Sequence, residues 1–364
     1  MSDRLLNPSA LADLIAAILR ADGCAEAEAR IVADHLVDAS LRGHDSHGVI
    51  RTARYHEWLR SGQIHANRPL LTVSDTGAML QLDGQDGMGQ RLAAEAAALG
   101  IERAAAHGLA LVSLRRAGHI GRVGAYAEQA AAAGLVSIHF VNVAGSRLVA
   151  PFGSAERCAS TNPVTIGVPN GDGDDFILDF ATSSVAEGKA LVAAQGGKPL
   201  PDAALIGGDG VPTGDPAALY GDSLATGVPD PRGGPGALRA MGEHKGSGLA
   251  LACELLAGAL TGNGTNGKAD APFGNGMLSI FIRPAELDAP GGFAREVADY
   301  IAYIRGARPA AGVDRVRIPG DPERELRRRR LEEGLPAPEA VIEGIAGIAR
   351  ALGLAEMLPA LERR

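Results

Sequence analysis

Cysteine and aromatic residues are scarce in this chain. Its 364 residues include only three cysteines, Cys24, Cys158 and Cys253, and aromatic residues make up 4%. The cysteines are odd in number, widely spaced and outside any Cys-x-x-Cys motif, which argues against a disulfide framework and against a zinc ribbon. With so few aromatic rings, the core must be built mainly from alanine, leucine, isoleucine and valine.

An excess of positive charge and long apolar runs are also missing. The net charge of −8 argues against nucleic acid as a partner, because binding phosphates needs a basic surface. The most apolar helical segment, residues 248–260, contains Glu254 and is too short to span a bilayer. Residues 1–8 lack the basic and apolar regions of a signal peptide. We therefore expect a cytoplasmic protein that binds neither nucleic acid nor a membrane.

Hydrophobic periodicity predicts an α/β chain with helices at both ends and strands in the middle. A Gly-, Pro- and Asp-rich stretch, residues 196–240, is expected to be a long loop. We expect a sheet domain at residues 69–285 and a discontinuous helical domain at residues 1–68 and 286–364. The expected helices are residues 9–20, 25–41, 90–106, 123–133, 184–194, 244–260, 292–304, 322–333 and 339–352. The expected strands are residues 70–74 and 78–82, as a hairpin, then 109–114, 136–143, 165–168, 176–180 and 277–282.

The densest polar cluster is Gly-His-Asp-Ser-His-Gly-Val-Ile-Arg at residues 43–51. Ser46 is expected to cap a helix that runs to about Arg60. His47 and Arg51 are four residues apart and would share one face of that helix. There the guanidinium could hold a carboxylate while the imidazole bonds a neighbouring oxygen. A capped helix start with solvated polar residues is the alternative interpretation.

The same cluster allows a metal site. His44 and His47 are three residues apart, and with Asp45 they could begin the site of a metal-dependent hydrolase. No further set of His, Cys or Glu at ligand spacing lies nearby in the sequence. We expect no metal and keep the hydrolase as a remote alternative.

His119 stands in the segment Gly-His-Ile-Gly at residues 118–121, where a predicted strand gives way to a helix. Catalytic residues are common in such connections. Histidine exchanges protons near neutral pH, and the flanking glycines would let a ligand approach the backbone. An incidental histidine in a helix-capping loop is the alternative.

No segment completes a Rossmann fingerprint in the right context. Gly87-x-Gly89 follows a strand but has Leu92 in place of the third glycine, and the complete pattern at residues 262–267 follows a helix. A dinucleotide would therefore bind by another architecture. Asp179 ends a strand and could accept hydrogen bonds from ribose hydroxyls or cap the next helix. Lys245, at a helix N-terminus, could meet a pyrophosphate.

The basic run at residues 327–330 is surrounded by glutamates. The spacing predicts i, i+4 pairs between Glu323 and Arg327 and between Glu325 and Arg329. We interpret this run as a solvated helix face and not as a nucleic-acid patch.

Taken in order, these segments resemble the malate/L-lactate dehydrogenase family that is separate from the Rossmann-type enzymes. The resemblance covers nearly the whole chain. The His-Ile-Gly form, with Phe-Val-Asn-Val at residues 140–143, is most similar to the hydroxycarboxylate dehydrogenase branch. The other segments that carry it are Gly-His-Asp-Ser-His-Gly at 43–48, Ala-Pro-Phe-Gly at 150–153, Ser-Thr-Asn-Pro at 160–163, Leu-Asp-Phe-Ala-Thr-Ser at 178–183, Gly-Val-Pro-Thr-Gly-Asp-Pro at 210–216, Glu-His-Lys-Gly-Ser-Gly-Leu at 243–249 and Ile-Pro-Gly-Asp at 318–321.

The resemblance implies a non-Rossmann NAD(P)-binding domain with a largely antiparallel central sheet, and a homodimer whose site lies near the subunit contact. It implies hydride transfer between the cofactor and a small 2-oxo or 2-hydroxy acid such as malate or lactate. NAD is the expected cofactor, and NADP stays open. The family also includes a cyclic-imine reductase, so reduction of a cyclic-imine (ketimine) carboxylate with NADPH is the alternative.

The resemblance also implies roles for individual residues. His119 is the expected proton donor and acceptor, and His47 and Arg51 are the expected substrate-binding pair, with Ser46 beside them. Some relatives differ where this chain has Gly145-Ser146, and many differ at Ser160 and at Ser247, so contacts near the cofactor are expected to differ there. The expected cofactor contacts are Ile120, Gly121, Asn162, Asp179, Phe180, Ala181 and Lys245.

Overall fold

The computed structural model describes residues 4–171, 174–194, 198–224, 230–267, 272–288 and 291–362. Parts of two expected segments lie outside the described residues. They are residues 172–173, in the turn expected between two strands, and residues 196–197 and 225–229, in the expected long loop.

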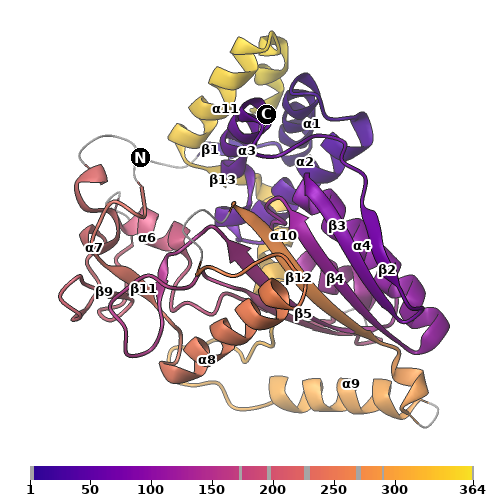
Figure 1. The fold of residues 1–364 in the computed structure, drawn as a ribbon. Coiled ribbons are helices and arrows are strands. Elements are labelled where there is room, and N and C mark those ends of the chain that lie inside the picture. The colour runs from indigo at the N-terminus through magenta and orange to yellow at the C-terminus, as the bar shows by residue number, and fades with distance from the viewer. Residues whose placement is uncertain are drawn as a thin grey trace.

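A seven-stranded sheet forms the middle of the molecule (Figure 1). Its order is β2-β3-β4-β12-β5-β7-β8, and every neighbouring pair is antiparallel except β3 and β4. The expected hairpin of β2 and β3 is confirmed, as is the largely antiparallel sheet of an α/β chain. The strands are β2 (Leu71–Asp75), β3 (Met79–Gly87), β4 (Leu109–Ala117), β5 (Val136–Ala144), β7 (Val164–Val168), β8 (Phe176–Phe180) and β12 (Gly274–Ile282).

Helices cover both faces of this sheet (Figure 1). Helix α4 (Gly89–His107) packs behind it in that view, and α8 (His244–Cys253) lies in front. Helix α5 (Gly124–Ala132) contacts α4. The middle strand shows the division, because successive residues of a strand point to opposite faces. A Cβ on Gly100 of α4 would meet the ring of Phe281, whereas a Cβ on Gly276 would meet the π-helical turn η4 (Glu254–Ala259), which continues α8.

A second apolar core joins the two ends of the chain. The antiparallel strands β1 (Arg4–Leu6) and β13 (Leu335–Ala337) tie these ends together. Asn7 caps the first helix, since its side-chain oxygen accepts from two backbone N–H groups of the first turn. Because the two ends share this core, we propose a helical domain of residues 1–68 and 286–364 and a sheet domain of residues 69–285. The helices that form the second core are α1 (Pro8–Ala21), α2 (Glu26–Leu41), α3 (Thr52–Ser61), α11 (Glu339–Ala351) and the 3-10 helix η6 (Ala355–Leu361).

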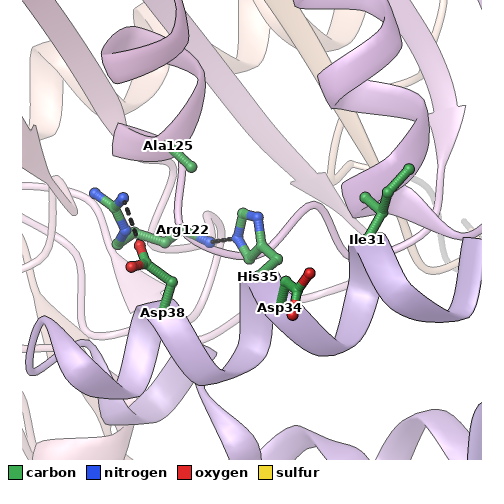
Figure 2. Close-up of a pocket in the computed structure, with 6 residues that line it drawn as sticks. All are labelled: Ile31, Asp34, His35, Asp38, Arg122 and Ala125. Atoms are coloured by element: carbon green, nitrogen blue, oxygen red, sulfur yellow. Dashed lines mark hydrogen bonds and ion pairs between the residues drawn. The ribbon is translucent and has the colours of Figure 1, made fainter. Parts of the chain in front are cut away.

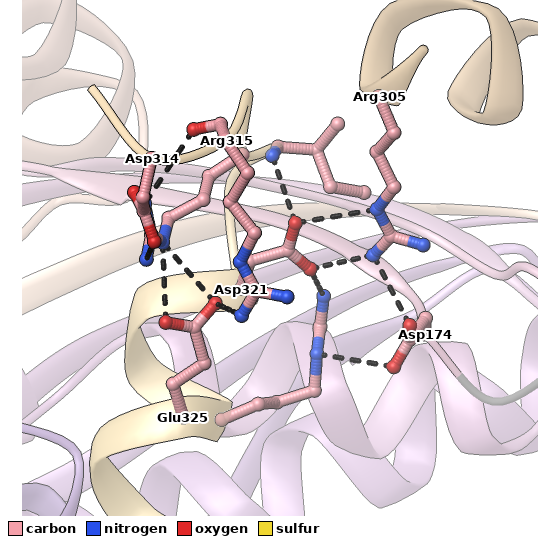
Figure 3. Close-up of polar contacts among 9 residues, drawn as sticks. Asp174, Arg305, Asp314, Arg315, Asp321 and Glu325 are labelled. Atoms are coloured by element: carbon pink, nitrogen blue, oxygen red, sulfur yellow. Dashed lines mark hydrogen bonds and ion pairs between the residues drawn. The ribbon is translucent and has the colours of Figure 1, made fainter. Parts of the chain in front are cut away.

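An ion-pair network fixes the connection between α9 (Gly292–Arg305) and α10 (Asp321–Glu333) (Figure 3). Asp321 is nearly buried and accepts at 2.6 Å from both Arg305 and Arg324. Both guanidinium groups also reach Asp174, which follows β7 in the chain. The network therefore holds the start of α10 against the edge of the sheet domain. Among the described residues, no helix is long and apolar enough to cross a membrane.

The prediction of a long loop at residues 196–240 is wrong for the residues of this range that the structure describes. Three strands of two or three residues join β6 (Val149–Ala150) in a small sheet of order β10-β9-β11-β6. Strands this short carry no periodic pattern, but Leu205, Leu219 and Leu238 are fully buried in one apolar cluster. The elements within residues 196–240 are β9 (Leu205–Ile206), β10 (Pro212–Thr213), α7 (Ala217–Tyr220), η3 (Gly221–Leu224) and β11 (Ala237–Arg239). Helix α6 (Glu187–Ala194) precedes this region, and η5 (Pro284–Glu286) follows β12.

The prediction of a helix from Ser46 to about Arg60 is wrong at the start of that range. Two 3-10 turns, η1 (Asp45–His47) and η2 (Val49–Arg51), precede α3. A Cβ on Gly48 would lie 1.9 Å from the hydroxyl oxygen of Ser40, and this oxygen accepts from the N–H that follows Gly48. The close contact holds Gly48 in extended backbone, so one continuous helix cannot form. Ser46 lies inside η1 and does not cap α3, whose N-cap residue is Arg51.

The pairs expected within α10 are also wrong. Arg327 bonds Asp38 on α2 at 2.7 Å, and Glu323 lies 3.6 Å from the Nε2 of His44. Glu325 accepts from arginines of the preceding connection (Figure 3). The reason is tertiary: α10 packs against α2, which brings Asp38 to Arg327 and His44 to Glu323 in place of the expected partners. Arg327 and Arg330 thus pair with other elements, whereas Arg328 and Arg329 are exposed, so the basic run is only partly solvated.

Candidate active site

Two imidazole rings stack where the helical core meets the sheet. His47 ends η1, and His119 follows β4 in the chain. Their ring centres are 5.2 Å apart with planes inclined by 11°, and Nδ1 of His47 lies 3.2 Å from Nε2 of His119. The fold thus brings two residues that lie 72 positions apart into hydrogen-bond contact.

Both rings are neutral in this environment. Burial, and next the nearby Arg51 charge, lower the pKa of His47 to about 3. The same two causes, in the same order, hold the pKa of His119 well below 6.5. A neutral imidazole has one N–H donor and one free acceptor nitrogen. The pair can therefore both give and accept hydrogen bonds near neutral pH.

Arg51 lies beside the histidine pair. Its Nε donates to the backbone oxygen of Ser46 at 2.6 Å, which orients the guanidinium. No carboxylate in the described ranges forms an ion pair with Arg51. Ser46 itself packs against α6, where a Cβ on Gly188 would lie 2.8 Å from the Cβ of Ser46. An unpaired guanidinium held beside two neutral rings suits a small anion.

The remaining nitrogen of His119 contacts Tyr55, which the sequence analysis missed. The phenol oxygen lies 2.6 Å from Nδ1 of His119, and Nε2 of Gln90 donates to this oxygen at 2.5 Å. Burial raises the pKa of Tyr55, so the phenol keeps its proton. Tyr55 follows Arg51 by four residues, and this helical spacing could have pointed to Tyr55 from the sequence. No sequence pattern pointed to Gln90.

The backbone of the His119 loop is tied to three different elements. Ile120 donates its N–H to the side-chain oxygen of Asn275 on β12 at 3.0 Å, and its carbonyl accepts from the phenol of Tyr126. Arg122 donates its N–H to Nε2 of His35 at 2.9 Å. Because these polar groups are satisfied, the loop holds His119 in a fixed position.

A cavity of about 340 Å³ opens beside this loop, between α2 and the start of α5 (Figure 2). His35 and Arg122 lie on its wall, and the guanidinium of Arg122 reaches Asp38 at 3.5 Å. Gly121 has φ +72°, and a Cβ there would lie 2.4 Å from Nε2 of His35. Only glycine fits at this position, so His35 supports the loop from the cavity side.

The segments expected to contact a cofactor lie side by side. Thr182 donates its backbone N–H to the carbonyl of Thr161, and Met241 donates its N–H to the carbonyl of Thr182, both at 2.9 Å. These two bonds join the end of β8, the turn before β7 and the start of α8. The expected residues on the joined segments are Asn162, Asp179, Phe180, Ala181 and Lys245.

Asn162 has an unsatisfied polar atom. The side chain is fully buried, and its nitrogen donates to the carbonyl of Ala250 and to Glu254 at 3.1 and 3.0 Å. Its side-chain oxygen is buried without a partner in the described structure. Such an acceptor costs about 1–3 kcal/mol unless a donor reaches it. The expected helix at residues 244–260 becomes π-helical at Glu254, which places this carboxylate against Asn162.

Asp179 and Lys245 differ in how far the chain itself uses them. The two oxygens of Asp179 accept from the N–H of Gly124 and the hydroxyl of Thr165, both at 2.8 Å. Asp179 thus holds the start of α5, and not the helix that follows it in sequence. Lys245 is exposed in the first turn of α8, and within the described residues no carboxylate pairs with it.

The other two polar residues of the 43–51 cluster face α10. His44 lies 3.6 Å from Glu323, and Asp45 bonds Arg330 at 2.8 Å. His47 instead contacts His119, so His44 and His47 do not converge. In the part of the chain that the structure describes, no three side chains of His, Cys, Asp or Glu are grouped to hold a metal ion. The described contacts thus give the hydrolase alternative no ligand set.

Comparison with known proteins relates the whole chain to one family. The family model for malate/L-lactate dehydrogenase matches residues 6–346. Hydroxycarboxylate dehydrogenase B of Escherichia coli (strain K12) is 39% identical over 361 residues, which are 98% of this chain and 96% of that protein.

Solved structures agree over the same length. Sulfolactate dehydrogenase from Methanocaldococcus jannaschii superposes with a TM-score of 0.85 at 31% identity, covering 98% of this chain and 99% of that one. Delta1-piperideine-2-carboxylate reductase from Pseudomonas syringae pvar. tomato gives a TM-score of 0.80 at 28% identity, covering 95% and 100%. The chain therefore belongs to the malate/L-lactate dehydrogenase family.

Proposed function

We propose that this protein is an oxidoreductase that transfers hydride between NAD(P)H and a small 2-oxo acid, and from the 2-hydroxy acid in reverse. The observation that carries the proposal is the neutral pair His47 and His119 beside the unpaired guanidinium of Arg51. A 2-oxo acid presents a carboxylate next to a carbonyl, and this site offers a cation next to two groups that exchange protons. Family membership supports the same reaction class.

Arg51 would bind the substrate carboxylate. Its Nε is already used by Ser46, which leaves the outer nitrogens for the carboxylate. Binding also has an electrostatic effect, because a carboxylate offsets the positive charge that helps to lower the pKa of both histidines. Substrate binding would thus raise their pKa and let the pair take up a proton.

His119 would deliver that proton to the substrate oxygen through Nε2, with His47 in contact with the same nitrogen. The oxygen gains the proton while C2 gains a hydride, so the carbonyl becomes a hydroxyl. In the oxidation direction the pair accepts the proton instead. Positioned acid–base groups of this kind contribute about 10²–10⁴-fold to rate.

The cofactor would supply the hydride, and the residues present fit it. The unsatisfied oxygen of Asn162 suits the N–H donors of a nicotinamide carboxamide. Lys245 suits a phosphate, and Asp179 could use its remaining lone pairs for ribose hydroxyls. We propose Ile120, Gly121, Phe180 and Ala181 as further contacts, with NAD as the expected cofactor and NADP open.

The test is an absorbance screen at the nicotinamide band. The purified protein is mixed with NADH or NADPH and a panel of 2-oxo acids, including pyruvate, oxaloacetate and sulfopyruvate. We expect oxidation of one cofactor with at least one acid. Absence of turnover with every pair, by a folded protein, would overturn the proposal.

Reduction of a cyclic-imine carboxylate is the second candidate. It is favoured by the likeness to delta1-piperideine-2-carboxylate reductase. The same guanidinium would bind the carboxylate, and a C=N bond would replace the carbonyl. Adding a cyclic-imine acid to the screen separates the two. A kcat/KM for the imine far above that for every oxo acid would favour this candidate.

We also propose a homodimer, in line with the resemblance. Leu251 on α8, Leu255 on η4 and Tyr300 and Tyr303 on α9 are more than half exposed, and such apolar surface is typical of contact sites. Light scattering should give twice the mass of one chain, and the mass of a single chain would contradict the proposal. The cytoplasmic location stays a prediction.

A further inference from the structure

A chain of hydrogen bonds leads from the interior to the histidine pair. Gln90 and Tyr55 are each 1% exposed, and their contact continues through both nitrogens of His119 to His47. Four side chains, from three helical elements and the loop that follows β4, thus form one row of donors and acceptors. The direction in which each proton points along this row is fixed at its buried end.

Gln90 sets that direction. Its side-chain nitrogen faces the phenol oxygen of Tyr55, while its Oε1 is buried without a partner in the described structure. In this amide orientation the phenol accepts from Gln90 and has its own O–H left to donate. The phenol lies 2.6 Å from Nδ1 of His119, which is a distance typical of a donated O–H bond. Nδ1 is then an acceptor, and the single proton of the neutral ring sits on Nε2.

We propose that Tyr55 and Gln90 are positioning residues that hold His119 as its Nε2–H tautomer. The proton-bearing nitrogen then faces His47 and the substrate-binding side, and the acceptor nitrogen faces the interior. The inference rests on the proposed function for its importance, since a substrate carbonyl needs a donor at this nitrogen. A neutral imidazole N–H can polarise a carbonyl and stabilise the negative charge that develops on its oxygen.

The opposite tautomer needs a different arrangement. Nδ1–H would donate to the phenol, and the phenol would need an acceptor in place of the Gln90 nitrogen. A carboxylate at position 90 provides such an acceptor, because it has no N–H to donate. Gln90→Glu should therefore reverse the tautomer, whereas Gln90→Met should remove the bond without supplying an acceptor. Tyr55→Phe removes the donor to Nδ1.

The experiment is NMR of the full-length protein labelled with ¹⁵N-histidine, because the two ring-nitrogen shifts report which nitrogen carries the proton. The His119 signals are those that disappear in His119→Gln. We expect the Nε2–H form in the native protein, the Nδ1–H form in Gln90→Glu and a mixture in Tyr55→Phe. Tyr220→Phe is the matched control, since Tyr220 is also a buried tyrosine that donates to another side chain, Glu187. It should leave the His119 signals unchanged.

Kinetics give a second readout in the same variants. Tyr55→Phe and Gln90→Glu should lower kcat by about 10-fold or more and leave KM for the acid nearly unchanged, since Arg51 is untouched. An Nδ1–H form in the native protein would overturn the inference, as would Tyr55→Phe with native signals and native kcat. If Tyr55→Phe does not fold, the two Gln90 variants decide alone. Full turnover by His119→Gln would instead overturn the proposed function, and the NMR result would still stand.

Discussion

Two neutral histidines in different regions of this chain show what distinguishes a candidate catalytic ring from a core ring. His139 lies in β5, and its nitrogens contact the hydroxyls of Ser279 and Ser137 at 2.8 and 3.1 Å. His119 also has a partner on each nitrogen. Burial is the largest cause of a low pKa at both positions. By the direction of the pKa shift and by hydrogen bonding alone, the two rings look alike.

They differ in charge and access. For His139, which is 0% exposed, burial is the only cause of the lowered pKa. For His119 the charge of Arg51 contributes as well, and the ring is partly exposed at the boundary of two cores. A neutral histidine is therefore a candidate for chemistry when an unpaired cation and an open side accompany it, and a packing residue when they do not.

The largest expected difference between the two histidines appears when each ring is removed in turn. His119→Gln should lower kcat by about 10²–10⁴-fold, because the proton donor is lost. His139→Gln should leave kcat within about twofold and lower the melting temperature instead, since it disturbs only packing. Steady-state kinetics and thermal unfolding of both variants test this. Similar losses of kcat in both would show that the two rings do not differ in role.

The second prediction concerns the cation. Arg51→Lys should lower kcat/KM for the acid by about 10–100-fold, because a forked donor becomes a point charge and one charge-assisted bond is lost. Arg328→Lys, at an exposed position on α10, is the control and should not change it. Kinetics across the acid concentration range supply both values. Equal values for the two variants would remove Arg51 from substrate binding.

The third prediction uses pH to compare stability. The pKa of His139 is lowered to about 3 in the folded protein, so the unfolded chain takes up this proton first as pH falls below about 6.5. Stability from this group is complete above pH 6.5 and is lost as pH falls toward 3. His139→Gln should therefore reduce the slope of unfolding free energy against pH by about 1.4 kcal/mol per pH unit. Urea unfolding at pH 7, 6 and 5 measures the slope, and an unchanged slope would contradict the burial argument.

The smallest expected effect separates the partners of the two rings. Ser279→Ala removes the hydroxyl that contacts Nδ1 of His139 and should cost about 1 kcal/mol of stability with native kcat. The corresponding change beside His119 is Tyr55→Phe, for which a loss of kcat is expected. A loss of kcat in Ser279→Ala would show that the sheet interior is coupled to the chemistry.

The sequence predicted the regular parts of this fold well and the short parts poorly. Long periodic segments such as α4 and β5 follow from alternating or helical patterns of apolar residues. The strands of two or three residues in the region expected to be a loop have no period to detect, and they form because Leu205 and Leu238 bury in a shared cluster. The break at Gly48 depends on contact with Ser40, which local propensity does not contain.

The candidate site was predicted in its residue types more than in its connections. The resemblance pointed to His119, His47 and Arg51, and the structure places them together. It did not point to Tyr55 or Gln90, since a buried phenol and a buried amide are ordinary core residues until their partners are known. Asp179 was considered as a cap for the next helix, whereas it holds the start of α5, a contact that exists only in three dimensions.

The position of β12 has a consequence for how the molecule is made. Strands β4 and β5 are neighbours in sequence but do not pair with each other, since β12 lies between them. The sheet therefore closes only after about 130 further residues of chain have been synthesised, and loop-closure entropy of that kind slows folding. The same strand brings Asn275, which anchors the backbone of Ile120. A partly synthesised chain thus lacks the anchor of its His119 loop, and the site forms at the end of folding.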